Sequence, residues 1–408
     1  MIQTNGITAQ PPLTPAEARL LLLTSRPKLS LAQQALAADL VAQVTQWPVL
    51  VDTAWRKYTL QMVYKNLALL KAAPPPPETL ETMRSMALRS TIENMRQRAA
   101  FEKFHATCVA PLGLDYAYLK GPALAARFYP DPMQRLYRDI DILVQPQQHV
   151  RFLQHMRDQG CRIFRHNEAG TEFLDLDSDL ALAEFLFVTP VVHILTPQGQ
   201  VVDLHAEIDG HTSLFDTDML LHTAREVSTQ QNRIRVLRDP EHFVFICYHH
   251  TRHMWSKLNW VADLDAICSH PEFDRDAVMT YARKLRIDST VMASLELHEL
   301  ASAARHPSDF DRITPGVDLM RACIENFAGD LKLEYALRKG QRFRVIGFDW
   351  QPMPVSLWRR SWLHMRKLRP SHDDLRTFGG PRARRYAVAL GRRLARAAQS
   401  VWTRMVKG

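Results

Sequence analysis

Cysteine is scarce in this chain, and long apolar runs are absent. The 408 residues include five cysteines, at positions 108, 161, 247, 268 and 323. Their wide spacing contains no close pair of the kind that binds zinc, and a disulfide scaffold needs a far higher density of cysteine. No apolar stretch approaches the ~20 residues of a membrane-spanning helix, and residues 1–12 lack the basic-then-apolar order of a secretory signal. We therefore expect free thiols in a soluble, cytoplasmic protein.

Acidic residues are nearly missing from the C-terminal segment. Residues 357–408 contain 14 lysines and arginines but two aspartates, so this segment carries +12 while the whole chain carries +9. The basic charge belongs to the tail, and we expect no sequence-specific nucleic-acid partner. Residues 381–405 have the pattern of an amphipathic helix, with arginines opposite an apolar stripe. Such a helix can make a peripheral contact with an anionic membrane or pack on the helical part of the protein, and its alanine-rich stripe favours packing.

The periodicity of the chain changes along its length and predicts an α+β protein in four parts. These are a helical N-terminal region (1–110), a core with a small mixed sheet (111–212), a second helical region (213–345) and the basic tail (346–408). Thr14 is the expected N-cap of the first helix, with Pro15 at its first position. In the core we expect strands at LDYAYLKG, DIDILV and CRIFRH, and on both sides of the Pro-Gln-Gly turn in EFLFVTPVVHILTPQGQVVDLHAEI. From about Asp216 to residue 340 the pattern predicts helices.

Two carboxylates stand two residues apart at the start of the strand DIDILV. Asp139 and Asp141 point to the same face of that strand, and a hard cation such as Mg²⁺ relieves their repulsion. A later strand, VVDLHAEI, places Asp203, His205 and Glu207 on one face. If Asp203 lies beside the pair, three carboxylates form a site for two ions of the kind that clamps a phosphoryl displacement, with Asp203 as bridging ligand or general base. The alternative for the pair alone is a strand end with two solvated aspartates.

Basic residues that could contact phosphate lie just upstream of the acidic pair. Lys120 and Gly121 stand at a strand-to-helix turn, where glycine allows close backbone approach and lysine supplies charge. Arg135, four residues before Asp139, could hold a triphosphate, although a surface arginine is an equally good interpretation. Together with Lys120 and Gly121 it forms our predicted nucleotide-binding set.

These segments together resemble one family. LKGPALAARFYPDPMQRLYRDIDILV, followed by VVDLHAEI, is similar to the uncharacterised nucleotidyltransferases, a bacterial branch of the polymerase-β-like nucleotidyltransferase superfamily. The matching positions are Lys120, Gly121, Tyr129, Pro130, Pro132, Arg135, Asp139, Asp141, Leu143, Val144, Asp203 and His205. WRKYTLQMVYKNL, CYHHTRHMWSKLNWVADLDAI and LRPSHDDL resemble further parts of the family, so the resemblance covers most of the chain.

The resemblance implies a polymerase-β-like core in which Asp139, Asp141 and Asp203 bind two Mg²⁺, or Mn²⁺ in their place. It implies transfer of a nucleoside monophosphate from a nucleoside triphosphate, with ATP as the expected donor, to an acceptor hydroxyl. The acceptor could be a saccharide, a peptide, a small molecule or a protein. Two positions depart from the wider pattern: Lys-Gly replaces the usual Gly-Ser, and Ala206 stands where relatives tend to carry Trp.

A histidine pair lies on one predicted helix after the core. His249 and His253 are spaced i, i+4 and share a helix face. Zinc binding of the metalloprotease type requires glutamate after the first histidine, and His250 occupies that position. We therefore favour structural or substrate-contacting histidines, and we expect His249, His253 and His205 on the acceptor side of the cleft.

Other classes of protein share the acidic pair. In metal-dependent glycosyltransferases the apolar strand precedes Asp-x-Asp, and in haloacid-dehalogenase-type phosphatases the pair ends its strand, whereas here the apolar run follows the pair. A catalytically degenerate nucleotide-binding or antitoxin-like partner is the remaining alternative. Intact aspartates at 139, 141 and 203 count against such decay.

Overall fold

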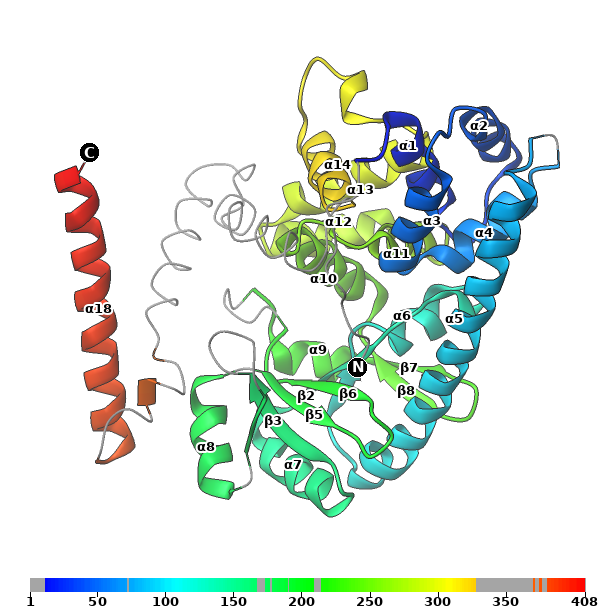
Figure 1. The fold of residues 1–408 in the computed structure, drawn as a ribbon. Coiled ribbons are helices and arrows are strands. Elements are labelled where there is room, and N and C mark those ends of the chain that lie inside the picture. Colours follow the sequence, from blue (N-terminus) through cyan, green and yellow to red (C-terminus); the bar gives the residue numbers. More distant parts are fainter. Residues whose placement is uncertain are drawn as a thin grey trace.

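The protein combines helices with one mixed β-sheet, as the sequence predicts (Figure 1). The computed structural model describes residues 12–71, 73–166, 173–176, 178–189, 191–208, 214–327, 370, 374–375 and 380–407. Most of the predicted tail before residue 380, including five of the eight residues of LRPSHDDL, lies outside these ranges. Within them, no helix is long and apolar enough to cross a lipid bilayer.

The N-terminal region is helical through residue 104. Its helices are α1 (Pro15–Thr24), α2 (Leu31–Val41), α3 (Trp47–Arg56), α4 (Leu60–Ala68) and the long α5 (Pro77–Phe104). Thr14 caps α1 as predicted, because its hydroxyl accepts from Glu17 N and the Glu17 carboxylate accepts from Thr14 N at 2.8 Å. In Figure 1, α5 runs down the side of the molecule from the other N-terminal helices to the level of the sheet.

Over the described residues the sheet has eight strands, in the order β4-β3-β5-β6-β2-β1-β8-β7. They are β1 (Tyr116–Tyr118), β2 (Asp139–Val144), β3 (Arg162–His166), β4 (Phe173–Asp175), β5 (Val191–Leu195), β6 (Val201–His205), β7 (Arg225–Ser228) and β8 (Arg233–Val236). The helices α6 (Pro122–Phe128), α7 (His149–Asp158), α8 (Asp179–Val188) and α9 (Thr217–Thr223) connect them. At the centre, β2 pairs parallel with β6 and antiparallel with β1, so the two strands predicted to carry carboxylates are neighbours.

Strands β5 and β6 flank the Pro-Gln-Gly turn as predicted, but two details of the predicted core are wrong. EFLFV, at the start of the segment in which the first of these strands was predicted, ends helix α8, whose N-cap Ser178 accepts from Ala181 N, because a short apolar run does not distinguish strand from helix. Residues 225–236 form the hairpin β7–β8 in what was predicted to be helix, and β8 pairs with β1. The sequence RIRV of β8 does alternate between polar and apolar residues, as a strand does, and Ile234 and Val236 are buried while the arginines are more exposed. The sheet is therefore larger than predicted and extends past residue 212.

Two hydrophobic cores pack on opposite faces of the sheet. Ile140, Ile142 and Val144 of β2 belong to one core, together with residues of α5 and α7. Leu143 faces the other way, into a core built with the remaining N-terminal helices and with α10 (Asp239–Arg252) and α11 (Leu258–Cys268). Because side chains alternate along a strand, Asp139 and Asp141 share the face of Leu143 and point toward the helical layer.

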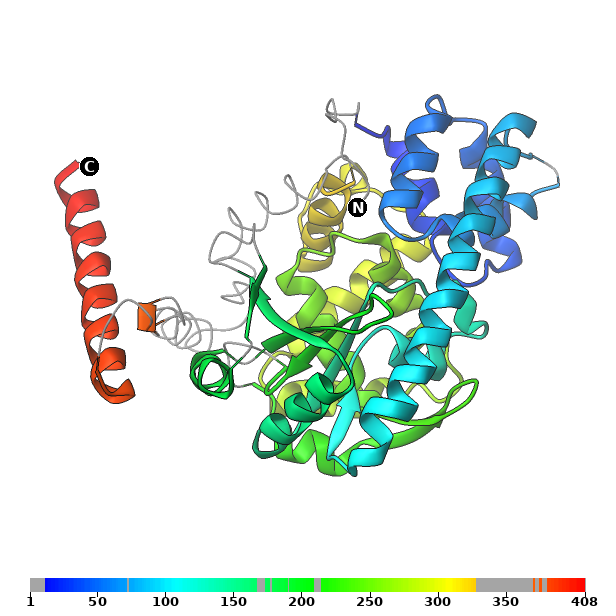
Figure 2. The same cartoon turned by 60° about the horizontal axis from the view of Figure 1, so that its bottom comes forward.

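The remaining described helices complete that layer and the C-terminus. α12 (Arg275–Lys284), α13 (Asp288–Ser302) and α14 (Pro315–Glu325) gather with α10 and α11 above the sheet in Figure 1. The basic helix α18 (Arg382–Lys407) stands at one side of the molecule in both views (Figures 1 and 2). Near its start it contacts α8, through an ion pair between Arg385 and Glu184 and a ring contact of Tyr386 with Phe187. These contacts are with α8 and not with the helical region that we expected as its partner.

Candidate active site

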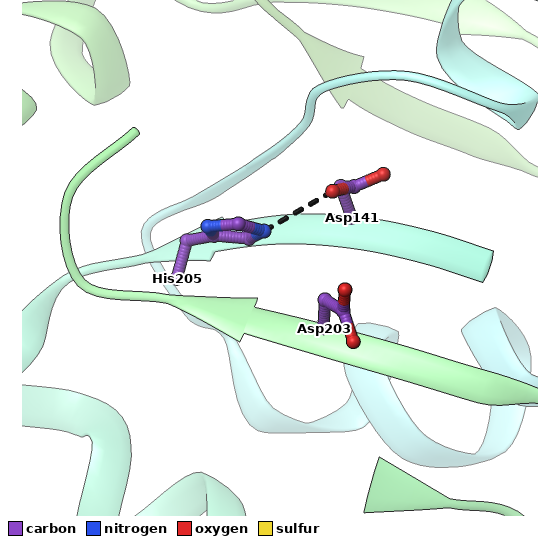
Figure 3. A group of neighbouring side chains, drawn as sticks. All are labelled: Asp141, Asp203 and His205. Atoms are coloured by element: carbon purple, nitrogen blue, oxygen red, sulfur yellow. Dashed lines mark hydrogen bonds and ion pairs between the residues drawn. The ribbon is translucent and has the colours of Figure 1, made fainter. Parts of the chain in front are cut away.

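Asp141 and Asp203 stand side by side on neighbouring strands. They are paired in the parallel register of β2 and β6, and their carboxylates rise from the same side of the sheet (Figure 3). His205 lies two residues further along β6, so its imidazole is on that side as well. One potential ligand atom from each of the three residues lies within 4.8 Å of the others. The parallel register therefore brings together the two predicted motifs, which are about sixty residues apart in sequence.

The Asp141 carboxylate is buried and held by basic groups. Its Oδ1 accepts from Lys120 Nζ at 2.8 Å and from His205 Nε2 at 3.2 Å, and its side chain is 2 % exposed. Burial alone would raise the pKa of Asp141, but the charge of Lys120 and the hydrogen bond from His205 outweigh it and hold the pKa far below its usual value. Asp141 is therefore ionised at neutral pH.

The second oxygen of Asp141 fits a role as metal ligand. Oδ2 is buried and has no hydrogen-bond partner among the described residues, which is costly for an ionised carboxylate. A divalent cation shared with Asp203 would satisfy it. Two carboxylates suit Mg²⁺ or Mn²⁺, and an imidazole ligand from His205 would favour Mn²⁺ of the two.

Asp139 lies outside this three-residue group. It is exposed at the start of β2, where its register partner is Val201 rather than an acidic residue. Its charge nevertheless reaches the site: burial would lower the pKa of Lys120, but Asp141 and then Asp139 raise it. Asp139 thus remains a proposed ligand at the open side of the site.

The Lys120-Gly121 turn runs against β2. Leu119 N donates to Asp141 O at 3.0 Å, which continues the β1–β2 ladder to the turn. Gly121 has φ +46°, and a Cβ there would lie 3.2 Å from Asp139 O and from Tyr137 Cγ. Glycine is therefore required here for close contact with the strand that carries the carboxylates. This packing places the Lys120 ammonium beside Asp141.

The predicted histidine helix reaches the same lysine. Lys120 Nζ donates to His249 Nε2 at 3.3 Å. Burial, and then the Lys120 charge, lower the pKa of His249 well below its usual value, so the imidazole is neutral and can accept this proton. The His249 ring lies 4.7 Å from that of His253 and 6.2 Å from that of Trp260. His249 and His253 therefore lie together on the helical side of the site, with His205 opposite them on the sheet.

Arg135 has a buried partner that sequence reasoning did not assign to it. Its Nε and Nη2 donate to the two oxygens of Asp263 at 3.0 and 2.8 Å, and both side chains are buried. Tyr129 Oη donates to the same carboxylate at 2.7 Å. The structure therefore gives Arg135 the role of fixing the segment before β2 to α11. A contact of Arg135 with phosphate stays a prediction.

His193 is a site residue that the sequence analysis missed. On β5 it is the register partner of Asp203, and its Nδ1 lies 2.7 Å from Asp203 Oδ1. The available signal was the alternation of VVHIL, where His193 breaks an apolar strand on the face shared with Asp203. Without the pairing of β5 with β6, nothing connected it to the carboxylates.

Comparison with known proteins agrees with this geometry. A family described as "Uncharacterised nucleotidyltransferase" matches residues 43–301, which is more than half of the chain and includes every residue of the site. No curated protein matches the chain. The chain therefore belongs to this nucleotidyltransferase family and is a transferase of phosphorus-containing groups.

Proposed function

We propose that the protein transfers a nucleoside monophosphate from a nucleoside triphosphate, with ATP as the expected donor, to an acceptor hydroxyl in a Mg²⁺-dependent reaction. The observation that carries this proposal is the pairing of Asp141 with Asp203, with a buried Asp141 oxygen that has no hydrogen-bond partner in the part of the chain that the structure describes. Two carboxylates held so close, in a family of nucleotidyltransferases, are the arrangement that phosphoryl transfer needs.

In this reaction the acceptor oxygen forms a bond to the α-phosphorus, and the bond from that phosphorus to the bridging oxygen breaks. The bonding electrons leave with pyrophosphate, and the proton of the acceptor hydroxyl passes to a base, for which we assign Asp203. Bound divalent ions would neutralise the charge that develops on the phosphate oxygens. The chain supplies Asp139, Asp141 and Asp203 to hold them.

The remaining site residues balance the charge of the carboxylates and hold them in position. Lys120 neutralises Asp141 and lies where its ammonium can approach a phosphate, while Gly121 keeps the turn against β2. His205 orients Asp141 through its hydrogen bond. His249 and His253 face the site from α10 and the turn after it, and we assign them to the acceptor side.

Calorimetric titration of non-hydrolysable ATP, GTP, CTP and UTP analogues, with and without Mg²⁺ or Mn²⁺, tests this proposal. Asp141→Asn and Asp203→Asn are compared with the wild type and with Asp158→Asn. Asp158 is an exposed aspartate at the end of α7, a helix that packs on the opposite face of the sheet. We expect metal-dependent binding of one analogue, lost in the two site variants and kept in Asp158→Asn.

If no triphosphate binds at any metal concentration, the catalytically degenerate partner becomes the better description. Binding that is independent of metal and unaffected by either site substitution would also contradict the proposal.

A further inference from the structure

Arg138 stands at the open edge of the site, directly before Asp139. It is exposed, and its guanidinium carbon lies 4.8 Å from the centroid of the Tyr58 ring. Lys257 Nζ lies 5.4 Å from the same centroid, so two cations approach one ring. Within the described part of the chain, Arg138 has no ion-pair partner. This distinguishes it from Arg135, whose guanidinium is occupied by Asp263.

A continuous series of contacts joins these cations to the carboxylates. Lys257 Nζ lies 5.3 Å from the Trp260 ring, which contacts the ring of His249. His249 bonds Lys120, and Lys120 pairs with Asp141. The series thus begins at Arg138, directly before β2, and ends on β2 at Asp141. Arg138 and Lys257 therefore border the same site as Lys120.

The backbone of Tyr58 is fixed by its neighbours, and this fixes the place of its ring. Tyr58 lies in the turn between α3 and α4 with φ +64°, a conformation that non-glycine residues seldom adopt and that surrounding structure must maintain. On one side, Thr59 N donates to Ala54 O, and on the other Asn259 N donates to Lys57 O at 3.3 Å. The N-terminal helices thereby present a fixed aromatic ring to cations from the core and from the start of α11.

We propose that Arg138 and Lys257 bind the β- and γ-phosphates of the donor nucleotide, with Tyr58 positioning both side chains. This inference rests on the proposed function. The guanidinium of Arg138 can bind phosphate oxygens with two parallel hydrogen bonds, and Lys257 adds a point charge. Arg138 directly precedes Asp139 and shares the Tyr58 ring with Lys257, so both cations gather near the start of β2, where we place the departing pyrophosphate. Arg138 thus takes the role that sequence reasoning assigned to Arg135.

Titration of inorganic tripolyphosphate with Mg²⁺ tests the inference without knowledge of the nucleobase or acceptor. Arg138→Gln and Lys257→Met are compared with wild type and with Arg151→Gln, an exposed arginine of α7 on the opposite side of the sheet. We expect each of the first two to bind about tenfold more weakly, because a charge-assisted contact is lost. Arg138→Lys should recover part of the affinity, and Arg151→Gln should match the wild type.

The nucleotide found in the calorimetric experiment gives the second measurement. Arg138→Gln should weaken binding of the triphosphate but leave binding of the corresponding monophosphate unchanged. Unaltered binding of both tripolyphosphate and nucleoside triphosphate in Arg138→Gln and Lys257→Met would overturn the inference while the proposed function stands. If the wild type binds neither tripolyphosphate nor a nucleoside triphosphate, both this inference and the proposed function are contradicted. Unchanged thermal unfolding of the variants establishes that any loss is not a loss of folding.

Discussion

Four side chains stand in one row across the sheet, one on each of four neighbouring strands. Register places Phe164 of β3 beside His193 of β5, His193 beside Asp203 of β6, and Asp203 beside Asp141 of β2. The His193 ring stacks on Phe164, with centroids 5.6 Å apart, while its Nδ1 contacts Asp203. Hydrogen bonds of this kind orient a ligating carboxylate. His193 is therefore a positioning residue for the proposed metal site.

We predict that His193→Leu weakens Mn²⁺ binding about tenfold and that His193→Asn does not. The amide nitrogen of asparagine can replace Nδ1 as donor to Asp203, whereas leucine fills the space without a donor. Titration of Mn²⁺, followed by calorimetry, measures the effect, and unfolding temperatures control for packing against Phe164. Equal Mn²⁺ affinity in the leucine variant and the wild type would show that His193 does not position Asp203 for metal binding.

Gly121 and Gly113 form a matched pair for testing close approach. Both have positive φ, +46° and +57°, but a Cβ at Gly121 would press on Asp139 O and Tyr137, while Gly113 has open space around it. We expect Gly113→Ala to cost about 1 kcal/mol of unfolding free energy and Gly121→Ala a further one to several kcal/mol. Urea unfolding of both variants gives the comparison. Similar losses would show that the contact with β2 is unimportant.

At the scale of elements, one buried ion pair joins the core to the helical layer. Arg135 precedes β2 and Asp263 lies in the middle of α11, and Tyr129 donates to the same carboxylate. Burial would raise the pKa of Asp263, but the charge and hydrogen bonds of Arg135, with His250 Nε2 3.7 Å from the carboxylate, outweigh it and lower that pKa. The pair therefore remains charged, and removal of one partner leaves the other buried without compensation.

We predict that Asp263→Asn and Arg135→Gln each lower the unfolding free energy by about 3–5 kcal/mol. The double variant Arg135→Met/Asp263→Leu should lose clearly less than the sum of the two single losses, because it leaves no unpaired charge. Tyr129→Phe should cost about 1–3 kcal/mol. Denaturant unfolding of the four variants measures these losses. A loss in the double variant equal to the sum of the two single losses would contradict coupling between Arg135 and Asp263.

At the scale of the whole molecule, buried histidines make stability depend on pH. Burial lowers the pKa of His242 and of His250 to about 4. His242 Nε2 donates to Leu119 O at 2.6 Å, and its Nδ1 is buried without a partner within the described ranges, so a second proton would have no acceptor there. Between pH 4 and the ordinary pKa of about 6.5, the unfolded chain therefore binds more protons than the folded one.

The stability that these neutral histidines contribute should consequently be fully present above about pH 6.5. As the pH drops toward 4, the unfolding free energy should fall by roughly 3 kcal/mol for each of them. His242→Gln keeps a donor for Leu119 O but does not titrate. It should therefore reduce the slope in this window by up to about 1.4 kcal/mol per pH unit. Urea unfolding at several pH values measures the slope. Carboxylates such as Asp263, whose pKa is lowered, act only below this window, so an unchanged slope would count against His242.

Sequence patterns were sufficient wherever a local rule decides the outcome. The period of two along DIDILV and VVDLH determined which side chains share a face, and Thr14 before Pro15 determined the start of α1, since both rest on contacts within a few residues. The family resemblance is confirmed over residues 43–301. The pattern failed where a short apolar run fits two structures, as at EFLFV.

Only the tertiary structure decided which distant groups meet. The sequence predicted three carboxylates on two strands, but the register of β2 with β6 places Asp141, and not Asp139, opposite Asp203. The packing of α11 brings Asp263 to Arg135 from 128 positions away, while the contact of Arg135 with phosphate stays a prediction. Register and helix packing depend on the burial of whole faces against each other, and this long-range property has no signature in the few residues around a motif. The chain thus determined by itself which chemical groups it contains, and its packing decided which of them form the site.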